Sequence, residues 1–193
     1  MQTDADYELL RLFASPLVAI TSRDRNRTNG MIADGAVRAS ISPKVPRLSV
    51  YIHKWHFSHD LIWNSGFLCI HLLHQGQMDL VHRLGFVSGR DKDKLAEIPH
   101  MTGATGVPVL RDRFAAFELR VINTMDAGYA THFLGHVEAV HQGGTGELLT
   151  APWFRANIPS AWHEAWLANY AKAQTEIESN SAIVDRQWTG PRA

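Results

Sequence analysis

Eleven histidines are spread through this chain of 193 residues, and imidazole is both a proton carrier and a common metal ligand. The closest groups are His53, His56 and His59, and the pair His132 and His136. A zinc ion needs three or four ligands that converge at about 2 Å, and this spacing does not impose such convergence. Because the chain has a single cysteine and no zinc-finger spacing, we expect no metal site.

A second candidate for chemistry is the run of small and mixed side chains over residues 31–40, MIADGAVRAS. Such a run makes a poor core strand, because it has little apolar surface to bury. It leaves the main chain open, so that a flat ligand can hydrogen-bond directly to N–H and C=O groups. The alternative is a solvent-facing edge strand that is rich in alanine and glycine.

Nucleotide-binding motifs and reactive cysteines offer little chemistry in this sequence. No glycine-rich dinucleotide fingerprint and no P-loop occur in the chain. Cys69 is the only cysteine, so an intrachain disulfide is excluded. Because Cys69 lies in an apolar run, we expect a buried structural thiol in a reducing compartment.

Composition limits the possible partners. Nineteen basic residues balance nineteen acidic ones, so no global field draws the chain toward nucleic acid or an anionic membrane. The longest apolar runs are far shorter than the roughly 20 residues that span a bilayer. The first residues, MQTD, do not resemble a secretory signal. We therefore expect one cytoplasmic domain over residues 1–193 that binds neither nucleic acid nor membrane.

Hydrophobic patterning predicts a mostly β chain around these candidates. Residues 48–53 alternate between apolar side chains on one face and Ser49, Tyr51 and His53 on the other. Asn29-Gly30 is a hairpin-type pair, so the next strand is expected to begin at Met31. The expected strands cover residues 17–22, 31–40, 48–53, 67–73, 115–123 and 132–140, and the last two form a hairpin.

Helical spacing of apolar residues predicts short helices between and after the strands. Ser58 is the expected N-cap of one of them, and Gly66 is expected to close it. The charged stretch over residues 88–106 is interpreted as a surface excursion with a helical turn near residues 94–98. The expected helices cover residues 3–13, 58–65, 78–84 and 160–177.

The last of these helices is rich in aromatic residues, among them Trp162, Trp166 and Tyr170. A large aromatic face is unfavourable in water, at roughly 25 cal/mol for each Å² of apolar area. We therefore expect this face to pack on the barrel or on a second subunit.

The ordered segments resemble the flavin reductase-like family from about residue 13 to residue 140. The resemblance implies a mostly β fold, an antiparallel FMN-binding split β-barrel of Greek-key type over about residues 13–140, with an aromatic helical extension over about 150–180. It also implies FMN as cofactor, with FAD as the alternative, and a homodimer. The segments that carry it are LVAIT (17–21), NGM (29–31), ASISP (39–43), LSVYI (48–52), SGF (65–67), PVL (108–110) and GHV (135–137).

The same resemblance assigns cofactor-binding residues. Ala33, Asp34 and Gly35 would face the flavin ring, and Ser40 would lie near the ribityl chain. The family's phosphate site maps to residues 53–59, where side-chain donors and a helix N-terminus have the chemistry to bind a phosphate. The alternative for that stretch is an ordinary loop with a capping serine. The complete predicted set is Met31, Ile32, Ala33, Asp34, Gly35, Ser40, Ile52, His53, Lys54, Trp55, Ser58 and His59.

One family feature is missing. Enzymes of this family commonly carry Gly-Asp-His before the last strand, where this chain has Gly128-Tyr129-Ala130. His132 follows two residues later, on the same face of a strand, and is the predicted catalytic residue. The missing motif puts the use of NAD(P)H in doubt, although it leaves the flavin untouched.

The resemblance thus implies an oxidoreductase that passes hydride or electrons from a reduced donor, with NAD(P)H as a possible co-substrate, through bound FMN to an acceptor. Without a dinucleotide motif, a nicotinamide would have to bind directly over the flavin. The alternatives are a flavin-binding electron carrier or sensor without turnover, and a fold that has no cofactor.

Overall fold

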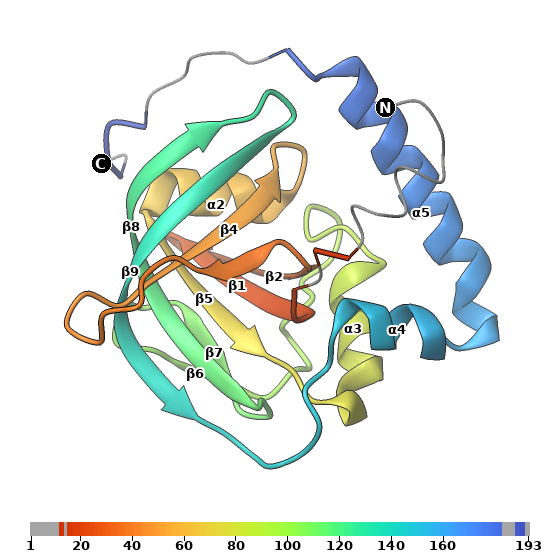
Figure 1. Ribbon diagram of the computed structural model, residues 1–193, viewed down its shortest axis with the longest axis horizontal. Coiled ribbons are helices and arrows are strands. Elements are labelled where there is room, and N and C mark those ends of the chain that lie inside the picture. The colour runs from red at the N-terminus through yellow and green to blue at the C-terminus, as the bar shows by residue number, and fades with distance from the viewer. Residues whose placement is uncertain (1–11, 14, 183–187, 192–193) are drawn as a thin grey trace.

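Seven antiparallel strands form one curved sheet in the computed structural model, which describes residues 12–13, 15–182 and 188–191 (Figure 1). The strands are β1 (Val18–Asp24), β2 (Arg27–Ala33), β3 (Ala36–Arg38), β4 (Arg47–His53), β5 (Phe67–Leu72), β8 (Ala115–Asp126) and β9 (Ala130–Gln142). Their order in the sheet is β2-β1-β5-β8-β9-β4-β3, so several neighbours are distant in the sequence. A small hairpin of β6 (His100–Thr102) and β7 (Pro108–Leu110) stands beside this half-barrel. The predicted mostly β, antiparallel fold is confirmed.

Four α-helices accompany the sheet in the described part of the chain. They are α2 (Phe57–Ser65), α3 (Met78–Gly85), α4 (Ala151–Asn157) and α5 (Ser160–Ser179), and a 3₁₀ turn, η1 (Gln75–Gln77), precedes α3. Figure 1 shows α3 and α4 together at one side of the barrel and α5 running from α4 toward the tip of the β8–β9 hairpin. None of these helices is long and apolar enough to cross a membrane. The helix predicted over residues 3–13 lies almost wholly outside the described residues.

The two-residue period of β1 divides the core into two layers. Val18 and Ile20 point into the barrel, where they join a cluster that includes Phe133. Leu17 and Ala19 point the other way, into a layer covered by α3 and α4. Buried apolar area of this kind stabilises the fold by roughly 25 cal/mol for each Å². The strand therefore holds the barrel and the helical layer in a fixed relation.

The predicted hairpin at Asn29-Gly30 is wrong. The chain turns at Arg25-Asn26, where Arg25 has a φ of 53°, and Gly30 pairs with Thr21 inside β2. Gly30 is needed there for space, because a Cβ atom would lie 2.8 Å from Cδ2 of Leu84 in α3. The glycine thus marks a close approach of strand and helix instead of a turn.

The start of α2 also differs from the prediction. Ser58 lies inside the helix and is fully buried, while His56 occupies the N-cap position without a side-chain cap. Gly66 ends the helix as predicted, in the left-handed region with a φ of 76°, and its N–H donates to the carbonyl of Ile62. The serine is used in a buried hydrogen bond, described below, and is therefore not free to cap the helix.

The stretch over residues 88–106 is only partly a surface excursion. Leu95 and Ile98 are buried in the helical layer, and a hydrogen bond from the Ile98 N–H to the Leu95 carbonyl closes a single turn without a helix. Cys69 is fully buried as predicted, and burial raises the pKa of its thiol. Leu95 and Ile98 were not predicted as core because charged residues surround them in the sequence.

A buried carboxylate fixes the loop between β6 and β7. Glu118 of β8 is fully buried and accepts hydrogen bonds from the N–H groups of Ala104 (2.9 Å) and Thr105 (2.7 Å) and from Nε2 of His141 (2.7 Å). Burial raises the pKa of Glu118, but these hydrogen bonds outweigh it and hold the pKa below the usual range. The carboxylate therefore stays ionised and stabilises the loop.

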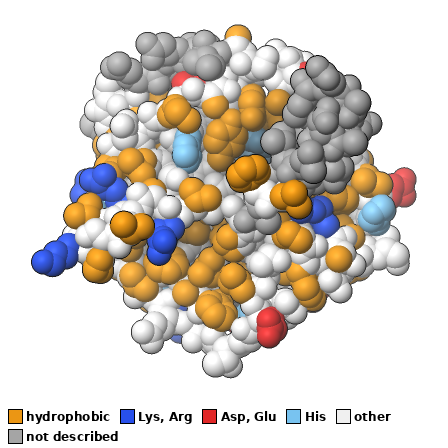
Figure 2. Space-filling view, viewed as in Figure 1, with side chains coloured by type: hydrophobic (Ala, Val, Ile, Leu, Met, Phe, Trp, Pro, Cys, Tyr) orange, Lys and Arg blue, Asp and Glu red, His pale blue; other side chains and the backbone are white. Residues whose placement is uncertain are grey.

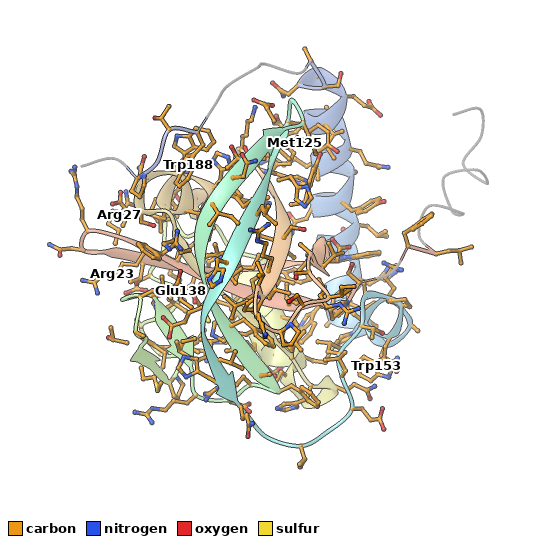
Figure 3. All side chains as sticks on the ribbon, turned by 60° about the vertical axis from the view of Figure 1, so that its left-hand side comes forward. Arg23, Arg27, Met125, Glu138, Trp153 and Trp188 are labelled. Carbon is orange, nitrogen blue, oxygen red and sulfur yellow. The ribbon has the colours of Figure 1, made fainter. Side chains whose placement is uncertain are left out.

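Replacing this carboxylate should destabilise the protein more than replacing an exposed one. Glu118→Gln leaves donors without a full set of acceptors, and we expect a loss of about 2–4 kcal/mol in the free energy of unfolding at pH 7, measured by urea denaturation. Glu138→Gln is the matched control, because Glu138 pairs with Arg120 on the outside of β9 (Figure 3) and exposed pairs contribute about 0–1 kcal/mol. Equal losses in the two variants would contradict the anchoring role of Glu118.

Candidate functional site

Two adjoining cavities lie between the ends of β2 and β4 and the helix α5. The α4 cavity has a volume of about 410 Å³ and extends to α4, and the loop cavity has a volume of about 560 Å³ and extends to the loop after α3. Figure 2 shows hydrophobic side chains gathered across the centre of the face turned to the viewer. The two cavities share a wall made of Ile32, His53, Gly85, Phe86 and Ala173.

The barrel side of the α4 cavity is formed by the end of β2 and the end of β4. Ile32, Ala33 and Asp34 line it at the point where β2 stops pairing, and His53 lines it from β4. Gly35 follows directly and passes over Tyr51, whose Cβ would be 3.1 Å from an added Cβ. Small side chains here leave main-chain groups accessible to a flat molecule.

Aromatic residues of the C-terminal helices form the opposite wall. Phe154 of α4 packs edge-on against Trp166 of α5, with ring centroids 6.5 Å apart, and Trp166 stacks on Tyr170 at 5.8 Å. Trp162, one turn earlier, stacks on His82 of α3 at 4.5 Å. The predicted helix over residues 160–177 is confirmed, and its aromatic face contacts α3 and α4 of the same chain. No residue of α5 is fully buried, so the helix covers the cavities without joining the core.

Basic side chains line the far end of the loop cavity. Lys94 is half-buried and donates from Nζ to the carbonyls of Leu84 (2.7 Å) and Val87 (3.0 Å), which fixes the loop after α3. It forms no ion pair with a carboxylate of the described residues, and burial lowers its pKa to about 8. Most of the amine is therefore still charged at pH 7. Arg90 lines the same cavity and pairs with the exposed Asp60 at 2.7 Å.

An unpaired polar atom lies in the same cavity. Asn29 is 3% exposed, and its side-chain amide donates to Oγ of Ser58 at 2.9 Å, while its carbonyl oxygen Oδ1 has no partner. Gly89 passes so close that an added Cβ would lie 2.0 Å from this oxygen. Buried polar atoms are nearly always hydrogen-bonded, so an orphan atom in a cavity is the mark of a ligand site.

Half of the predicted cofactor-binding residues line these cavities. Ile52 is fully buried in the barrel core, and Ser40 is engaged in a local turn, with its hydroxyl accepting from the N–H of Ser42. Neither of them reaches the cavities, and neither does Gly35. The predicted residues that do line the cavities are Met31, Ile32, Ala33, Asp34, His53 and Trp55.

The three predicted phosphate ligands are held elsewhere. Lys54 donates from Nζ to both carboxylate oxygens of Asp126 at 2.8 Å. Ser58 is tied to Asn29, and Nε2 of the buried His59 lies 2.9 Å from Oγ1 of Thr131. None of the three lines either cavity, because their side chains tie α2 and β4 to neighbouring strands. Their positions do not support the phosphate role predicted for them.

His132 lies on the outer face of β9. Its ring packs against Tyr51, with centroids 6.1 Å apart, and Tyr51 separates it from His53. His132 lines neither cavity, and burial lowers its pKa. Its position does not support the catalytic role predicted for it.

Two imidazoles at the cavity wall are neutral at physiological pH. Burial, together with the nearby His53, Lys94 and His59, lowers the pKa of His56 to about 4. Burial also lowers the pKa of His53, although the nearby Asp34 raises it in part. These rings therefore act as hydrogen-bonding and stacking groups and not as cations.

Several cavity residues were not predicted from the sequence. Loop residues 88–94 were interpreted as surface, although a serine, a glycine and an arginine directly after a helix are a signal for anion binding. The aromatic face was predicted to pack on the barrel or on a second subunit, and in the structure it lines the α4 cavity of its own chain. The unpredicted lining residues include His56, Ser88, Arg90, Lys94, Phe154, Arg155, Trp166 and Tyr170. No group of three or more potential metal ligands occurs among the described residues.

Comparison with known proteins identifies relatives over most of the chain. The sequence profile of the family described as "Flavin reductase like domain" matches residues 10–161. The high molecular weight rubredoxin of Moorella thermoacetica is 31% identical over 134 residues, which are 68% of this chain and 58% of that protein. The chain thus spans less than two thirds of that relative's length. The ferric-chelate reductase (NAD(P)H) of Archaeoglobus fulgidus is 26% identical over 147 residues, 75% of this chain and 86% of that protein.

A solved structure agrees with the fold. The FMN-binding protein of Thermus thermophilus, in a crystal structure with bound p-hydroxybenzaldehyde, is 32% identical and superposes with a TM-score of 0.62. The match covers 67% of this chain and 73% of that one. The split-barrel fold implied by the resemblance is therefore confirmed.

The depressed pKa of His56 predicts how stability changes with pH. The unfolded chain binds a proton near pH 6.5, but the folded protein resists it until about pH 4, so acidification through this window destabilises the folded state. His56→Gln removes a side chain that takes up a proton in the unfolded chain. We therefore expect a shallower fall in the free energy of unfolding between about pH 6.5 and 4 in this variant. Urea denaturation at several pH values measures the slope. An unchanged slope, together with an NMR titration midpoint for His56 near 6.5, would contradict the burial argument.

Proposed function

Because the chain belongs to the flavin reductase-like domain family, whose profile matches residues 10–161, we propose that it is an oxidoreductase that works with bound FMN. The observation that carries the proposal is the pair of joined cavities: aromatic rings and residues 32–34 line the α4 cavity, and Arg90 and Lys94 line the loop cavity. This distribution fits a molecule with a flat uncharged ring and a charged phosphate.

The loop cavity is the proposed site of the charged end. Lys94 is a half-buried cation without a carboxylate partner among the described residues, and it lines this cavity together with Arg90. Arg90 is held only by an exposed pair with Asp60, which contributes about 0–1 kcal/mol. Charged hydrogen bonds to a phosphate contribute roughly 1.5–3 kcal/mol each, so an anion competes well for Arg90.

The shared wall and the end of β2 are the proposed site of the ring. Residues 32–34 line the cavity there at the edge strand β2, and His53 and Phe86 add flat rings to the shared wall. Bound FMN would supply the redox chemistry of the site. The protein's contribution is to fix the position of the ring and to limit water, which the aromatic face of α5 does by covering the cavities.

The electron donor belongs to the proposal as well. The relative from Archaeoglobus fulgidus is named a ferric-chelate reductase (NAD(P)H), which supports a reduced nicotinamide as co-substrate. The chain has no dinucleotide fingerprint, so the nicotinamide would approach the open face of the ring inside the α4 cavity. FMN is the proposed flavin, and FAD is the alternative.

A second candidate function is a flavin-binding electron carrier or sensor without turnover of NAD(P)H. The observation that favours it is the sequence Gly128-Tyr129-Ala130, which stands where family enzymes commonly carry Gly-Asp-His. In the structure this turn is held by Asp126, whose Oδ1 accepts from the N–H of Gly128. His132 lines neither cavity and does not replace the missing histidine.

Assembly and location complete the proposal. Apolar side chains are exposed on β3, β8 and β9, among them Val37 (49%), Met125 (58%) and Val140 (58%), and such a face favours a homodimer. A monomer in sedimentation at micromolar concentration would contradict this.

We also propose that residues 1–193 act as one domain, and the single buried thiol, Cys69, supports a cytoplasmic location.

The visible spectrum of the purified protein tests the proposed function. We expect a yellow protein, or one that gains the flavin absorbance on incubation with FMN and binds FMN more tightly than FAD. Anaerobic addition of NADH or NADPH should then bleach the yellow band within seconds if the protein is a reductase. Binding without bleaching would favour the carrier, and a protein that stays colourless with either flavin would contradict the proposal.

Matched variants test where the charged end lies. Arg90→Gln should weaken FMN binding by about tenfold or more, because it removes a charged donor from the loop cavity. Lys54→Gln is the control, since Lys54 is paired with Asp126 and lies outside both cavities. Fluorescence titration with FMN measures both affinities. A larger effect of Lys54→Gln would place the phosphate where the sequence resemblance puts it.

A further inference from the structure

A cation without a counter-ion among the described residues lines the α4 cavity. Arg155 lies in the last turn of α4 and is half-buried beside the rings of Phe154, Trp166 and Tyr170. Its guanidinium makes no hydrogen bond and no ion pair with any residue in the described part of the chain. Asp34 lines the same cavity but forms no ion pair with it.

Other arginines of the helical layer are satisfied by the protein itself. Arg83 of α3 pairs with Glu97 at 2.7 Å, and Arg90 pairs with Asp60 at 2.7 Å. Arg155 lacks such a partner although it is less exposed than either of them. An uncompensated charge that is partly removed from water lowers stability, and an anion bound in the cavity would offset that loss.

Arg155 is also separate from the cations assigned to the flavin phosphate. Arg90 and Lys94 line the loop cavity and not the α4 cavity, whereas Arg155 lines only the α4 cavity. If FMN places its charged end in the loop cavity and its ring along the shared wall, Arg155 remains available to a second molecule that enters beside α4.

The surroundings of Arg155 define the chemistry of that molecule. A guanidinium presents a planar fork of N–H donors that matches the two oxygens of a carboxylate. Aromatic rings around it favour a flat, largely apolar body that can stack or pack edge-on. We propose that the α4 cavity is the subsite for a second small molecule beside the flavin, a planar aromatic carboxylate that Arg155 binds. This inference rests on the proposed function, because FMN must occupy the neighbouring wall.

Benzoate and benzamide form a matched pair of probes, since they share shape and differ in charge. We expect the FMN-loaded full chain to bind benzoate about tenfold more tightly than benzamide, measured by isothermal titration calorimetry. Arg155→Gln should abolish this preference and leave benzamide binding within about twofold. Arg155→Lys should retain part of it, because the charge remains but the fork is lost. Arg83→Gln is the control and should keep the full preference. FMN affinity should be the same in all four proteins.

The outcomes separate this inference from the proposed function. Equal affinity for the two probes in the unmodified chain overturns the inference without the use of any variant. A preference for benzoate that survives in Arg155→Gln overturns the inference as well. A loss of FMN affinity in that variant also overturns it, because Arg155 would then bind the flavin. If the unmodified chain does not bind FMN, the proposed function fails, and benzoate titration of the flavin-free chain still tests Arg155.

Discussion

The contact of β2 with the helical layer at Asn29 and Gly30 is the constraint on which the rest of the structure depends. Gly30 lets the strand approach Leu84 of α3, and Asn29 is buried beneath Gly89 while it is bonded to Ser58 of α2. One pair of residues thus fixes the positions of β2, α2, α3 and the loop that follows α3. A side chain at either glycine would separate these elements, because the packing leaves no space for it.

The joined cavities follow from this contact. Since β2 is held against α3, its last residues stop at the mouth of the barrel, next to the end of β4 and beside the loop that carries Lys94. The C-terminal helices then cover the opening with an aromatic face. The wall after β2, the cationic loop and the aromatic cover therefore come from segments that are far apart in the chain, which is the usual way in which a rigid barrel presents a site.

Local physical signals explain what the sequence could predict. The alternation over residues 48–53 and the left-handed Gly66 give β4 and the end of α2 correctly, because side-chain period and backbone freedom are properties of a few neighbouring residues. Other roles depend on what packs against a residue. Asn29-Gly30 was expected to form a turn but makes a close contact with α3, and Lys54 was expected to bind phosphate but forms a salt bridge with Asp126. Lys94 was expected at the surface but lines a cavity. Half of the predicted ligand positions line the cavities, namely residues 31–34 at the end of β2 and His53 and Trp55 at the end of β4.

A crystal structure of the FMN-loaded protein tests the central claim most directly, which is that the flavin lies between the barrel and α5. The account predicts density for the phosphate beside Arg90 and Lys94 and for the ring along Ile32 to Asp34, beneath the aromatic face of α5. Flavin density on the outer face of the sheet, beside Tyr51 and His132, with both cavities filled only by water, would contradict it.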